Sequence, residues 1–217
     1  MNPWDERAEA YRSSVTHATG DDLDTVVEWC NPHEGVKILD VATGGGHVAR
    51  RLRAEGAEVV TCDASPGMGA DVVCRAEDLP FRDGSFDVVV TRIAAHHFDD
   101  IGKAVGEMAR VSNRVVVVED TLYTSEDVEE AEKLRDPTHV RSLSEEEWRD
   151  LLVDAGLEVE QVELFEKVHG FDEWLARTGC EGEDARRVRE LLGELTTGDG
   201  GVWRDTKIAL KARKSQR

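Results

Sequence analysis

Two acidic residues, each placed after an apolar run, are the residues whose type and spacing most clearly predict chemistry. Asp40 follows the apolar run that begins at Val36, and three glycines come soon after it, at Gly44–Gly46. Asp63 ends the next apolar run, about 20 residues after the glycines, where an acid can accept hydrogen bonds from ribose hydroxyls. Glycine lets the backbone approach a ligand closely, and a helix that begins there offers unpaired N–H groups. The pattern predicts a site for a nucleoside cofactor.

A dinucleotide cofactor is the alternative that the same turn allows. Gly44 and Gly46 with Ala49 satisfy the dinucleotide fingerprint, so the motif is only moderately specific. A carboxylate at Asp40, however, would lie close to phosphate charge and repel it. Asp40 instead suits a cationic or hydroxyl-bearing ligand, so the sequence favours a nucleoside cofactor other than NAD.

Three histidines are candidates for moving a proton. His96 and His97 follow a predicted strand at residues 86–92, and His139 lies in "DPTHVR". Histidine titrates near neutral pH, so His96 or His97 could take a proton from an O–H, an N–H or an acidic C–H. One member of this pair could instead be packed and bonded to backbone, and the sequence leaves that alternative open. For His139 we expect a role in shaping a substrate pocket rather than in catalysis.

Apolar runs of strand length alternate with segments of helical periodicity along the chain. This alternation predicts an α/β fold with a mostly parallel sheet covered on both faces. The strands are expected at residues 36–41, 57–62, 71–74, 86–92, 114–120, 157–167 and 202–211. The helices are expected at residues 4–29 (broken near residues 19–20), 47–55, 101–111, 125–134, 144–155, 171–178 and 183–195.

The predicted strand ends bring further polar groups beside the two acids. In open α/β sheets a ligand lies at the carboxyl ends of the strands, near the point where the strand order reverses. Arg92, Glu119 and Asp120 come at such ends. The last two predicted strands are more polar and alternate in character, which is typical of a hairpin at a sheet edge.

Composition indicates one acidic domain. The 217 residues carry 46 acidic side chains against 27 lysines and arginines, for a net charge of −19. Because nucleic acid phosphates need a basic patch, we expect no nucleic-acid partner. The same charge is typical of proteins adapted to high salt and equally of an ordinary acidic surface, and the sequence does not decide between them.

The sequence has no membrane-spanning, secretion or metal-binding pattern. No apolar run is long enough to span a bilayer and no signal-peptide pattern is present, so we expect a cytoplasmic protein without membrane insertion. The four cysteines lack CxxC spacing, which argues against a zinc site or a disulfide framework, and no metal is expected. The oligomeric state is open, with a homodimer as one alternative.

Several linked motifs resemble those of a known family. They span nearly the whole chain and read, in order, "WDERAEAYRSSVTHATGDDL", "LDVATGGGHVA", "TCDASPGM", "AEDLPFRDGSFDVVV", "TRIAAHHFDD" and "LRDPTHVRSLSEEEW". The chain resembles class I S-adenosylmethionine-dependent methyltransferases, in the small-molecule branch that includes ubiquinone/menaquinone C-methyltransferases. This resemblance implies S-adenosyl-L-methionine as cofactor and a Rossmann-like, seven-stranded, mostly parallel sheet with helices on both faces and an N-terminal helical lid.

The resemblance also implies roles for individual residues. Asp40 would lie close to the ammonium group of the cofactor, and Asp63 would bind both ribose hydroxyls. The glycine turn would hold the methionine part, the segments after Asp63 and before Leu79 would meet adenine, and the N-terminal lid would close over the site. The further positions expected to contact the cofactor are Tyr11, Ser14, His17, Ala42, Gly44, Gly45, Gly46, Ala64, Met68, Ala76, Glu77, Arg92 and Ile93.

The chain departs from the family pattern in two places near the expected adenine site. Only "GADVV" separates Met68 from Cys74, where family members usually have a full helix. Arg75 stands where many members place an aspartate that faces the adenine amino group, a role that Glu77 or Asp78 could take.

The resemblance implies a single methyltransferase domain over residues 1–217, divided into a lid (1–30), a cofactor-binding half (31–125) and an acceptor-side half (126–217). The expected function is methyl transfer to a small-molecule acceptor, neutral or cationic and partly apolar. One alternative is a nicotinamide-dependent oxidoreductase, although the chain lacks a Tyr-x-x-x-Lys pair. The other is a non-catalytic S-adenosylmethionine-binding protein, which the shortened connection and Arg75 suggest.

Overall fold

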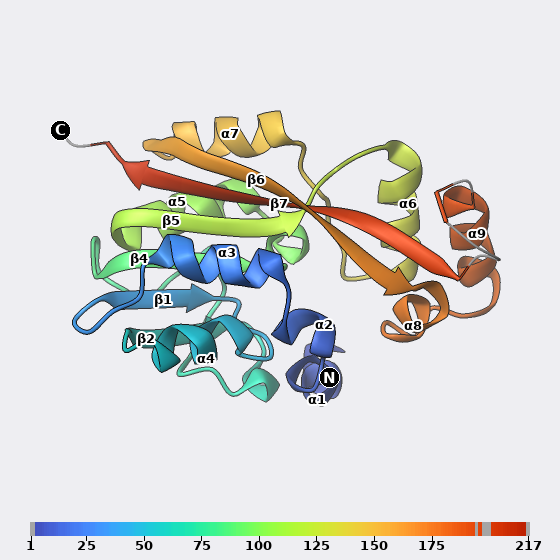
Figure 1. Ribbon diagram of the computed structural model, residues 1–217, viewed down its shortest axis with the longest axis horizontal. Coiled ribbons are helices and arrows are strands. Elements are labelled where there is room, and N and C mark those ends of the chain that lie inside the picture. The colour runs from blue at the N-terminus through green and yellow to red at the C-terminus, as the bar shows by residue number, and fades with distance from the viewer. Residues whose placement is uncertain (1–2, 194, 197–200, 216–217) are drawn as a thin grey trace.

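A computed structural model describes residues 3–193, 195–196 and 201–215, which contain one seven-stranded sheet (Figure 1). The strand order is β3-β2-β1-β4-β5-β7-β6, and all neighbours are parallel except that β7 runs antiparallel to β5 and to β6. Because the order reverses between β1 and β4, the carboxyl ends of the parallel strands leave a crevice there. The strands are β1 (Lys37–Val41), β2 (Glu58–Asp63), β3 (Val72–Val73), β4 (Phe86–Arg92), β5 (Ser112–Thr121), β6 (Leu157–Gly170) and β7 (Val202–Lys214).

Helices cover both faces of this sheet. Successive strand residues point to opposite faces, so Ile38 packs in one apolar cluster with α3 and α4, while Leu39 packs in another with α5 and α7. The helices are α1 (Pro3–Arg12), α2 (Val15–Ala18), α3 (Asp21–Cys30), α4 (His47–Ala54), α5 (Ile101–Val111), α6 (Glu126–Arg135), α7 (Glu145–Asp154), α8 (Phe171–Ala176) and α9 (Gly182–Leu192).

A third apolar cluster lies beyond the carboxyl ends of the sheet. The hairpin of β6 and β7 runs on past the other strands, and α6, α8 and α9 surround its far end (Figure 1). Phe171, Trp174 and Trp203 are buried there, together with Val188 and Leu192 from α9. The last third of the chain therefore builds its own core next to the strand ends.

The structure confirms the predicted fold class and differs from the sequence prediction in local detail. The predicted break near residues 19–20 is present at Gly20, with φ +130°, where α3 begins; a second break, which the sequence analysis did not predict, separates α1 from α2. Residues 64–71, between β2 and β3, contain only a 3₁₀ turn at Pro66–Met68, which confirms that the connection is short. None of the helices in the described part of the chain has the length and apolar character of a membrane-spanning segment.

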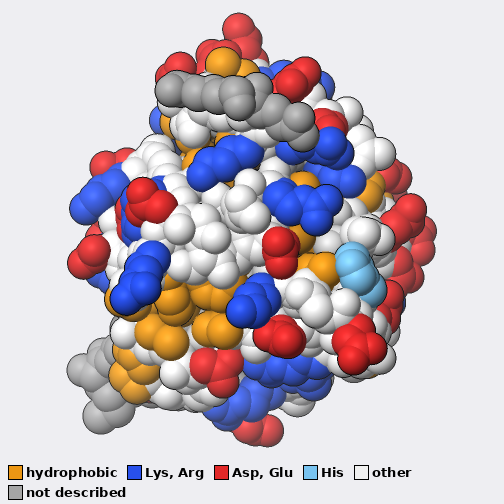
Figure 2. Space-filling model, turned by 90° about the vertical axis from the view of Figure 1, so that its left-hand side faces the viewer, with side chains coloured by type: hydrophobic (Ala, Val, Ile, Leu, Met, Phe, Trp, Pro, Cys, Tyr) orange, Lys and Arg blue, Asp and Glu red, His pale blue; other side chains and the backbone are white. Residues whose placement is uncertain are grey.

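The face at the amino ends of the parallel strands carries mixed charge. It is the left-hand side in Figure 1, from which the arrows of β1 and β5 point away. On it, Lys and Arg side chains lie among Asp and Glu (Figure 2). This face therefore presents no single-sign field, and the main cavity of the described chain lies at the opposite, carboxyl ends.

Candidate functional site

A cavity of about 660 Å³, called the large cavity below, lies where the carboxyl ends of β1, β2 and β4 meet α1 and α2. Its volume falls in the range of roughly 300–1,000 Å³ that is typical of small-molecule and cofactor sites. The predicted site residues that line it are Tyr11, His17, Asp40, Ala42, Gly44, Gly45, Asp63, Ala64, Met68, Ala76, Glu77, Arg92, Ile93, His97 and His139.

The glycine turn forms the floor of the large cavity between β1 and α4. Gly44 and Gly46 have φ values of +51° and +72°, which glycine adopts without the penalty that a Cβ brings. Ala42 is also in the left-handed region, at φ +53°, although it carries a Cβ. The turn is closed by the Gly46 N–H, which donates to the carbonyl oxygen of Thr43 at 2.8 Å, and the Thr43 N–H donates to the carbonyl oxygen of Cys62 on β2 at 3.0 Å.

Asp40 is a buried carboxylate at the edge of this turn. Its residue is 2% exposed, and its Oδ2 accepts a hydrogen bond from the Thr43 hydroxyl at 2.6 Å. Burial raises the pKa of Asp40 to about 6, and the nearby Asp63 contributes in the same direction. Among the ion pairs of the described residues none involves Asp40, so this charge is available to a cationic group in the large cavity.

Asp63, at the end of β2, faces the same space. Its two carboxylate oxygens accept backbone N–H groups, from Gly44 at 3.0 Å and from Ser65 at 2.9 Å. Burial raises the pKa of Asp63 in spite of these bonds. The two bonds fix the carboxylate beside the glycine turn while further lone pairs stay open to hydroxyl donors.

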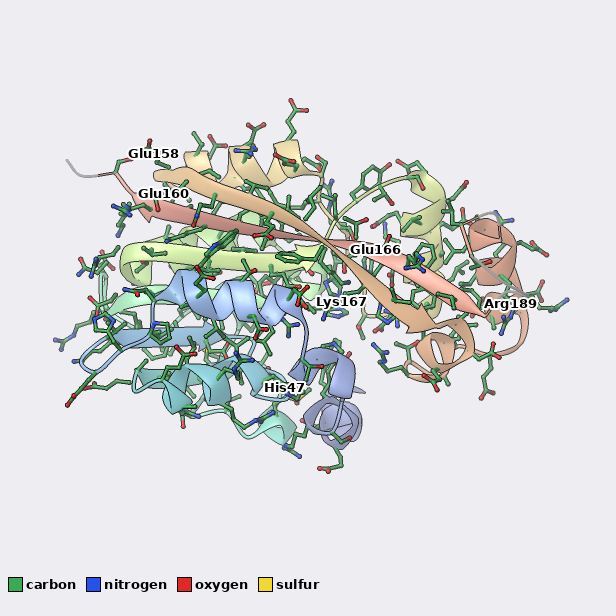
Figure 3. The ribbon with its side chains drawn as sticks, in the orientation of Figure 1. His47, Glu158, Glu160, Glu166, Lys167 and Arg189 are labelled. Atoms are coloured by element: carbon green, nitrogen blue, oxygen red, sulfur yellow. The ribbon has the colours of Figure 1, made fainter. Side chains whose placement is uncertain are left out.

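The N-terminal helices pack directly on the glycine turn. A Cβ at Gly45 would lie 2.5 Å from the carbonyl oxygen of Tyr11, so only glycine allows this contact. His47 Nε2 donates to the same carbonyl at 2.8 Å, and Arg50 donates to His47 Nδ1 at 2.7 Å. Figure 3 labels His47 at the start of α4, beside α2. The end of α1 is thereby held against the large cavity.

A second attachment of α1 lies near the 3₁₀ turn. Asp5 Oδ1 accepts hydrogen bonds from the Ser65 hydroxyl at 2.5 Å and from the Gly67 N–H at 2.7 Å. The Trp4 ring stacks edge-on against His97, with ring centroids 4.6 Å apart. These contacts place α1 over the large cavity and against the candidate base.

A buried cluster of charges ties the carboxyl ends of β4 and β5 to α3 and β6. Arg92 pairs with Asp22 and with Glu119, whose Oε2 lies 2.5 Å from the Arg92 Nε. Lys167 lies 2.9 Å from Asp22 and is labelled at the middle of the molecule in Figure 3. Burial raises the pKa of Glu119 to about 8 against the effect of Arg92. The Arg92 guanidinium is therefore engaged in this cluster, and its side chain is only 4% exposed.

Ile93, next to Arg92, lies in strained backbone between β4 and the histidine pair. Its φ is +51°, a conformation that is a genuine outlier for a β-branched residue. Its N–H donates to the Glu119 carbonyl at 2.7 Å, which holds it there. Strain of this kind clusters at functional sites, and Ile93 lines the large cavity.

His97 lines the large cavity in an orientation suited to a base. Its Nδ1 lies 3.0 Å from the carbonyl oxygen of Thr138, which can only accept, so Nδ1 carries the proton and Nε2 has the lone pair. The Thr138 hydroxyl donates to Asp136 at 2.7 Å, which fixes the segment that holds the ring. Burial and the charge of His96 lower the pKa of His97 to about 3, so the imidazole is neutral at physiological pH.

His96 and His139 are held by carboxylates. His96 donates from its backbone N–H and from Nδ1 to Asp120, at 2.6 and 2.5 Å, and it is buried. His139 is also buried, with Nε2 3.2 Å from Glu129, and it lines the large cavity. His96 is thus the packed member of the pair. Its ring is bonded to the Asp120 side chain, whereas the sequence analysis considered a bond to backbone.

Three predicted site residues do not line the large cavity. The Ser14 hydroxyl is 2.7 Å from Nδ1 of His17, which lines the cavity, so Ser14 orients the His17 ring. Gly46 is the N-cap of α4 and lies behind Gly45 in the turn. His96 lines a smaller neighbouring cavity because Asp120 holds its ring on that side.

The sequence motifs also contain lining residues that were not singled out. Most of them lie within the motifs quoted above, and Arg75 was considered there only as a departure from the family pattern. Trp4 begins the first quoted motif, and Pro137 and Thr138 directly precede His139. The lining residues outside the predicted set are Trp4, Thr43, His47, Val48, Cys74, Arg75, Ala94, Phe98, Asp99, Pro137, Thr138 and Val140.

Comparison with known proteins gives the following similarities. Residues 39–114 match the family model of a methyltransferase domain. The chain is 31% identical to the uncharacterized methyltransferase YcgJ of Bacillus subtilis, over 86% of this chain and 82% of that protein. It is 41% identical to the demethylmenaquinone methyltransferase of Thermus thermophilus, over only 38% of this chain and 46% of that enzyme. The crystal structure of the Bacillus halodurans protein BH2331 superimposes with a TM-score of 0.80 at 30% identity, covering 91% of this chain and 100% of that one.

The buried charge cluster predicts a large loss of stability when its central cation is removed. In Arg92→Met, Asp22 and Glu119 lose their shared partner, and the free energy of unfolding should fall by about 3–5 kcal/mol. Urea denaturation followed by circular dichroism at pH 7 measures this loss.

The matched control is Arg149→Met on α7, which breaks an exposed pair with Glu145. That change should cost less than about 1 kcal/mol, because exposed pairs contribute little. Equal small losses in both variants would contradict a structural role for the cluster.

Proposed function

The chain belongs to the class I S-adenosylmethionine-dependent methyltransferases, and we propose that its large cavity holds this cofactor beside a small-molecule acceptor. The single observation that carries the proposal is the buried Asp40 carboxylate, which faces the cavity with no cation from the described residues. The ammonium group of the cofactor would supply that cation, and the cavity volume suits a nucleoside.

The residues present fit the other parts of this cofactor. Gly44 and Gly45 bring backbone to the cavity wall without side chains in the way, next to Asp40. Asp63 would accept both ribose hydroxyls, since its carboxylate is fixed but retains free lone pairs. We assign the adenine to the region of Ala64 and Met68.

The far side of the adenine region is formed by Ala76, Glu77 and Arg75. Arg75 donates to Asp99 at 2.6 Å and to Glu77 at 3.2 Å. The guanidinium is thus turned to these acids, and the Glu77 carboxylate also accepts the N–H of Asp99 at 2.9 Å. These bonds order the loop, so that Ala76 and Glu77 could meet the adenine edge.

The chemistry asked of the protein is orientation, exclusion of water and acceptance of one proton. When bound, S-adenosylmethionine supplies an electrophilic methyl group whose bond to sulfur breaks with the electron pair left on sulfur. The residues of this chain would then hold the acceptor in line with the bond from sulfur to the methyl group and exclude water. If the attacking atom carries a proton, we assign its removal to His97 Nε2, because Nδ1 is occupied by Thr138. His96, bonded to Asp120, would position that ring rather than exchange protons with the acceptor.

The wider organisation follows from the same proposal. Residues 1–30 would act as a lid, supported by the contacts of Tyr11 with Gly45 and His47. Residues 31–125 would hold the cofactor and residues 126–217 the acceptor, within one methyltransferase domain over residues 1–217. A nicotinamide-dependent oxidoreductase and a non-catalytic binding protein find no support in the comparisons.

Location, partners and enzyme class complete the proposal. The four cysteines are free thiols, which supports a reducing, cytoplasmic location. Net charge supports the absence of a nucleic-acid partner. A homodimer stays an alternative, and the enzyme is assigned to the methyltransferases of EC 2.1.1.

Removal of the proposed ribose contact should weaken cofactor binding. Asp63→Ala is expected to reduce the affinity for S-adenosylhomocysteine at least tenfold, because a paired ribose contact contributes roughly 1.5–3 kcal/mol. Isothermal titration calorimetry measures this affinity. Asp150→Ala, an exposed acid on α7, is the control and should bind like the parent protein. Unchanged affinity in Asp63→Ala would mean that the ribose site is misplaced.

Removal of the proposed base should separate chemistry from cofactor binding. His97→Ala is expected to slow methyl transfer to a proton-bearing acceptor, measured as formation of S-adenosylhomocysteine, by roughly 10²–10⁴-fold. This is the usual contribution of a general base. Cofactor affinity should stay nearly intact. His33→Ala, an exposed histidine, is the control. If His97→Ala unfolds instead, or turns over at the parent rate, the ring is a packing residue and not the base.

A further inference from the structure

A second, smaller cavity of about 50 Å³ adjoins the large one on the side of the last third of the chain. Four residues line both cavities and form the wall between them: Tyr11, His17, Ile93 and His97. A molecule in the small cavity would therefore lie next to the proposed base and next to the strained residue at the end of β4.

The small cavity is rich in cations, and most of them are already paired. Lys207 lies 2.8 Å from Asp205 and donates to the Thr121 hydroxyl at 2.6 Å. Arg135 lies 3.0 Å from Glu132, with its guanidinium over the Trp174 ring. Lys167 is held by Asp22 in the charge cluster. The carboxylates of Asp205, Glu132 and Asp22 are thus already paired with neighbouring cations. Its charged or titratable lining residues are Tyr11, His17, His96, His97, Glu132, Arg135, Asp136, Lys167, His169, Arg177, Asp205 and Lys207.

Arg177 differs from the other cations. It follows α8, is half-buried and lines the small cavity, yet within the described ranges its guanidinium has neither an ion pair nor a hydrogen bond. Burial and the positive charge of Arg135 lower the pKa of Arg177. The positive charge of Arg177 also acts on His17. The pKa of His17 lies well below its ordinary value because of burial and the charges of Arg177 and Arg92. Four cationic side chains thus line the small cavity against three carboxylates, and Arg177 is the cation that none of these carboxylates pairs with.

A second polar group on this wall also lacks a partner. His169, on β6, is 6% exposed, and its Nε2 lies 3.2 Å from Asp205. Its Nδ1 is buried and has no hydrogen-bond partner among the described residues. Buried polar nitrogens are almost always bonded to protein or to water, so this nitrogen is open to a molecule in the adjoining cavity. Asp205 accepts from the opposite nitrogen, which fixes the ring with Nδ1 left for that molecule.

We propose that the small cavity is the acceptor subsite and takes a carboxylate, with the Arg177 guanidinium as its charged partner and the His169 Nδ1 lone pair as the acceptor for an O–H or N–H group of the same molecule. The inference rests on the proposed methyl transfer, for which it names the acceptor class as small carboxylic acids. The planar guanidinium matches the two oxygens of a carboxylate. The reacting atom of the acceptor would then face His97, which lines both cavities. This differs from the neutral or cationic acceptor expected from the sequence.

The test is binding of matched acids and amides to the protein saturated with S-adenosylhomocysteine. The probes are acetate and acetamide, benzoate and benzamide, and phenylacetate and phenylacetamide, each titrated by calorimetry. At least one acid should bind at least about tenfold more tightly than its amide, the size of a charge-assisted contact. Arg177→Met should abolish this preference and Arg177→Lys should retain part of it. Arg187→Met, an exposed arginine on α9, should leave it unchanged.

Two outcomes overturn the inference: no acid is preferred over its amide, or the preference survives in Arg177→Met. Failure of the proposed function is read separately, from the first step of the same experiment. If S-adenosylhomocysteine does not bind the parent protein, the proposed function fails. If it binds and no acid is preferred, only the acceptor class fails. Heat denaturation of Arg177→Met is the folding control, and a charge without a partner should be removable without loss of melting temperature.

Discussion

The burial of one carboxylate at the carboxyl end of β1 is the constraint on which the site depends. Asp40 is 2% exposed and receives the Thr43 hydroxyl, but within the described chain no lysine or arginine pairs with it. Burying an unpaired charge is costly, and the cost appears as a pKa raised to about 6. Groups with strongly shifted pKa values cluster at functional sites, and the proposed ligand would supply the opposite charge here. The glycine turn, Asp63 and the N-terminal helices all converge on that point.

The sheet topology creates this convergence, and the Arg92 cluster holds it in place. The strand order reverses between β1 and β4, so the segments after these strands diverge and leave room for a ligand. Arg92 joins the end of β4 to Glu119 on β5 and to Asp22 on α3, which fixes the strand ends relative to the N-terminal region. Beyond it, the extended hairpin of β6 and β7 brings Lys167 and His169 to the wall of the small cavity. The large and small cavities thus share one wall, which includes Ile93 and His97.

Much of this could be predicted from the sequence because the signals are local. Asp40 and the glycines lie within seven residues of one another. The turn they form needs positive φ at Gly44 and Gly46, and glycine at these positions indicates such a turn. The alternation of strands and helices likewise gave the fold class. The engagement of Arg92 could not be predicted, because its partner Asp22 is 70 residues away and reaches it only in the folded chain. The pairing of His96 with Asp120 and the open Nδ1 of His169 are non-local for the same reason.

The most direct test of the account is the pKa of Asp40, measured with and without ligand by carboxyl-carbon NMR on protein labelled at its aspartate side chains. Asp40→Asn assigns the signal. In the free protein the Asp40 midpoint should lie near pH 6. It predicts a clearly lower midpoint when S-adenosylhomocysteine is bound, since a neighbouring ammonium favours the charged carboxylate. An identical midpoint in both states, or an ordinary aspartate value in the free protein, would contradict it.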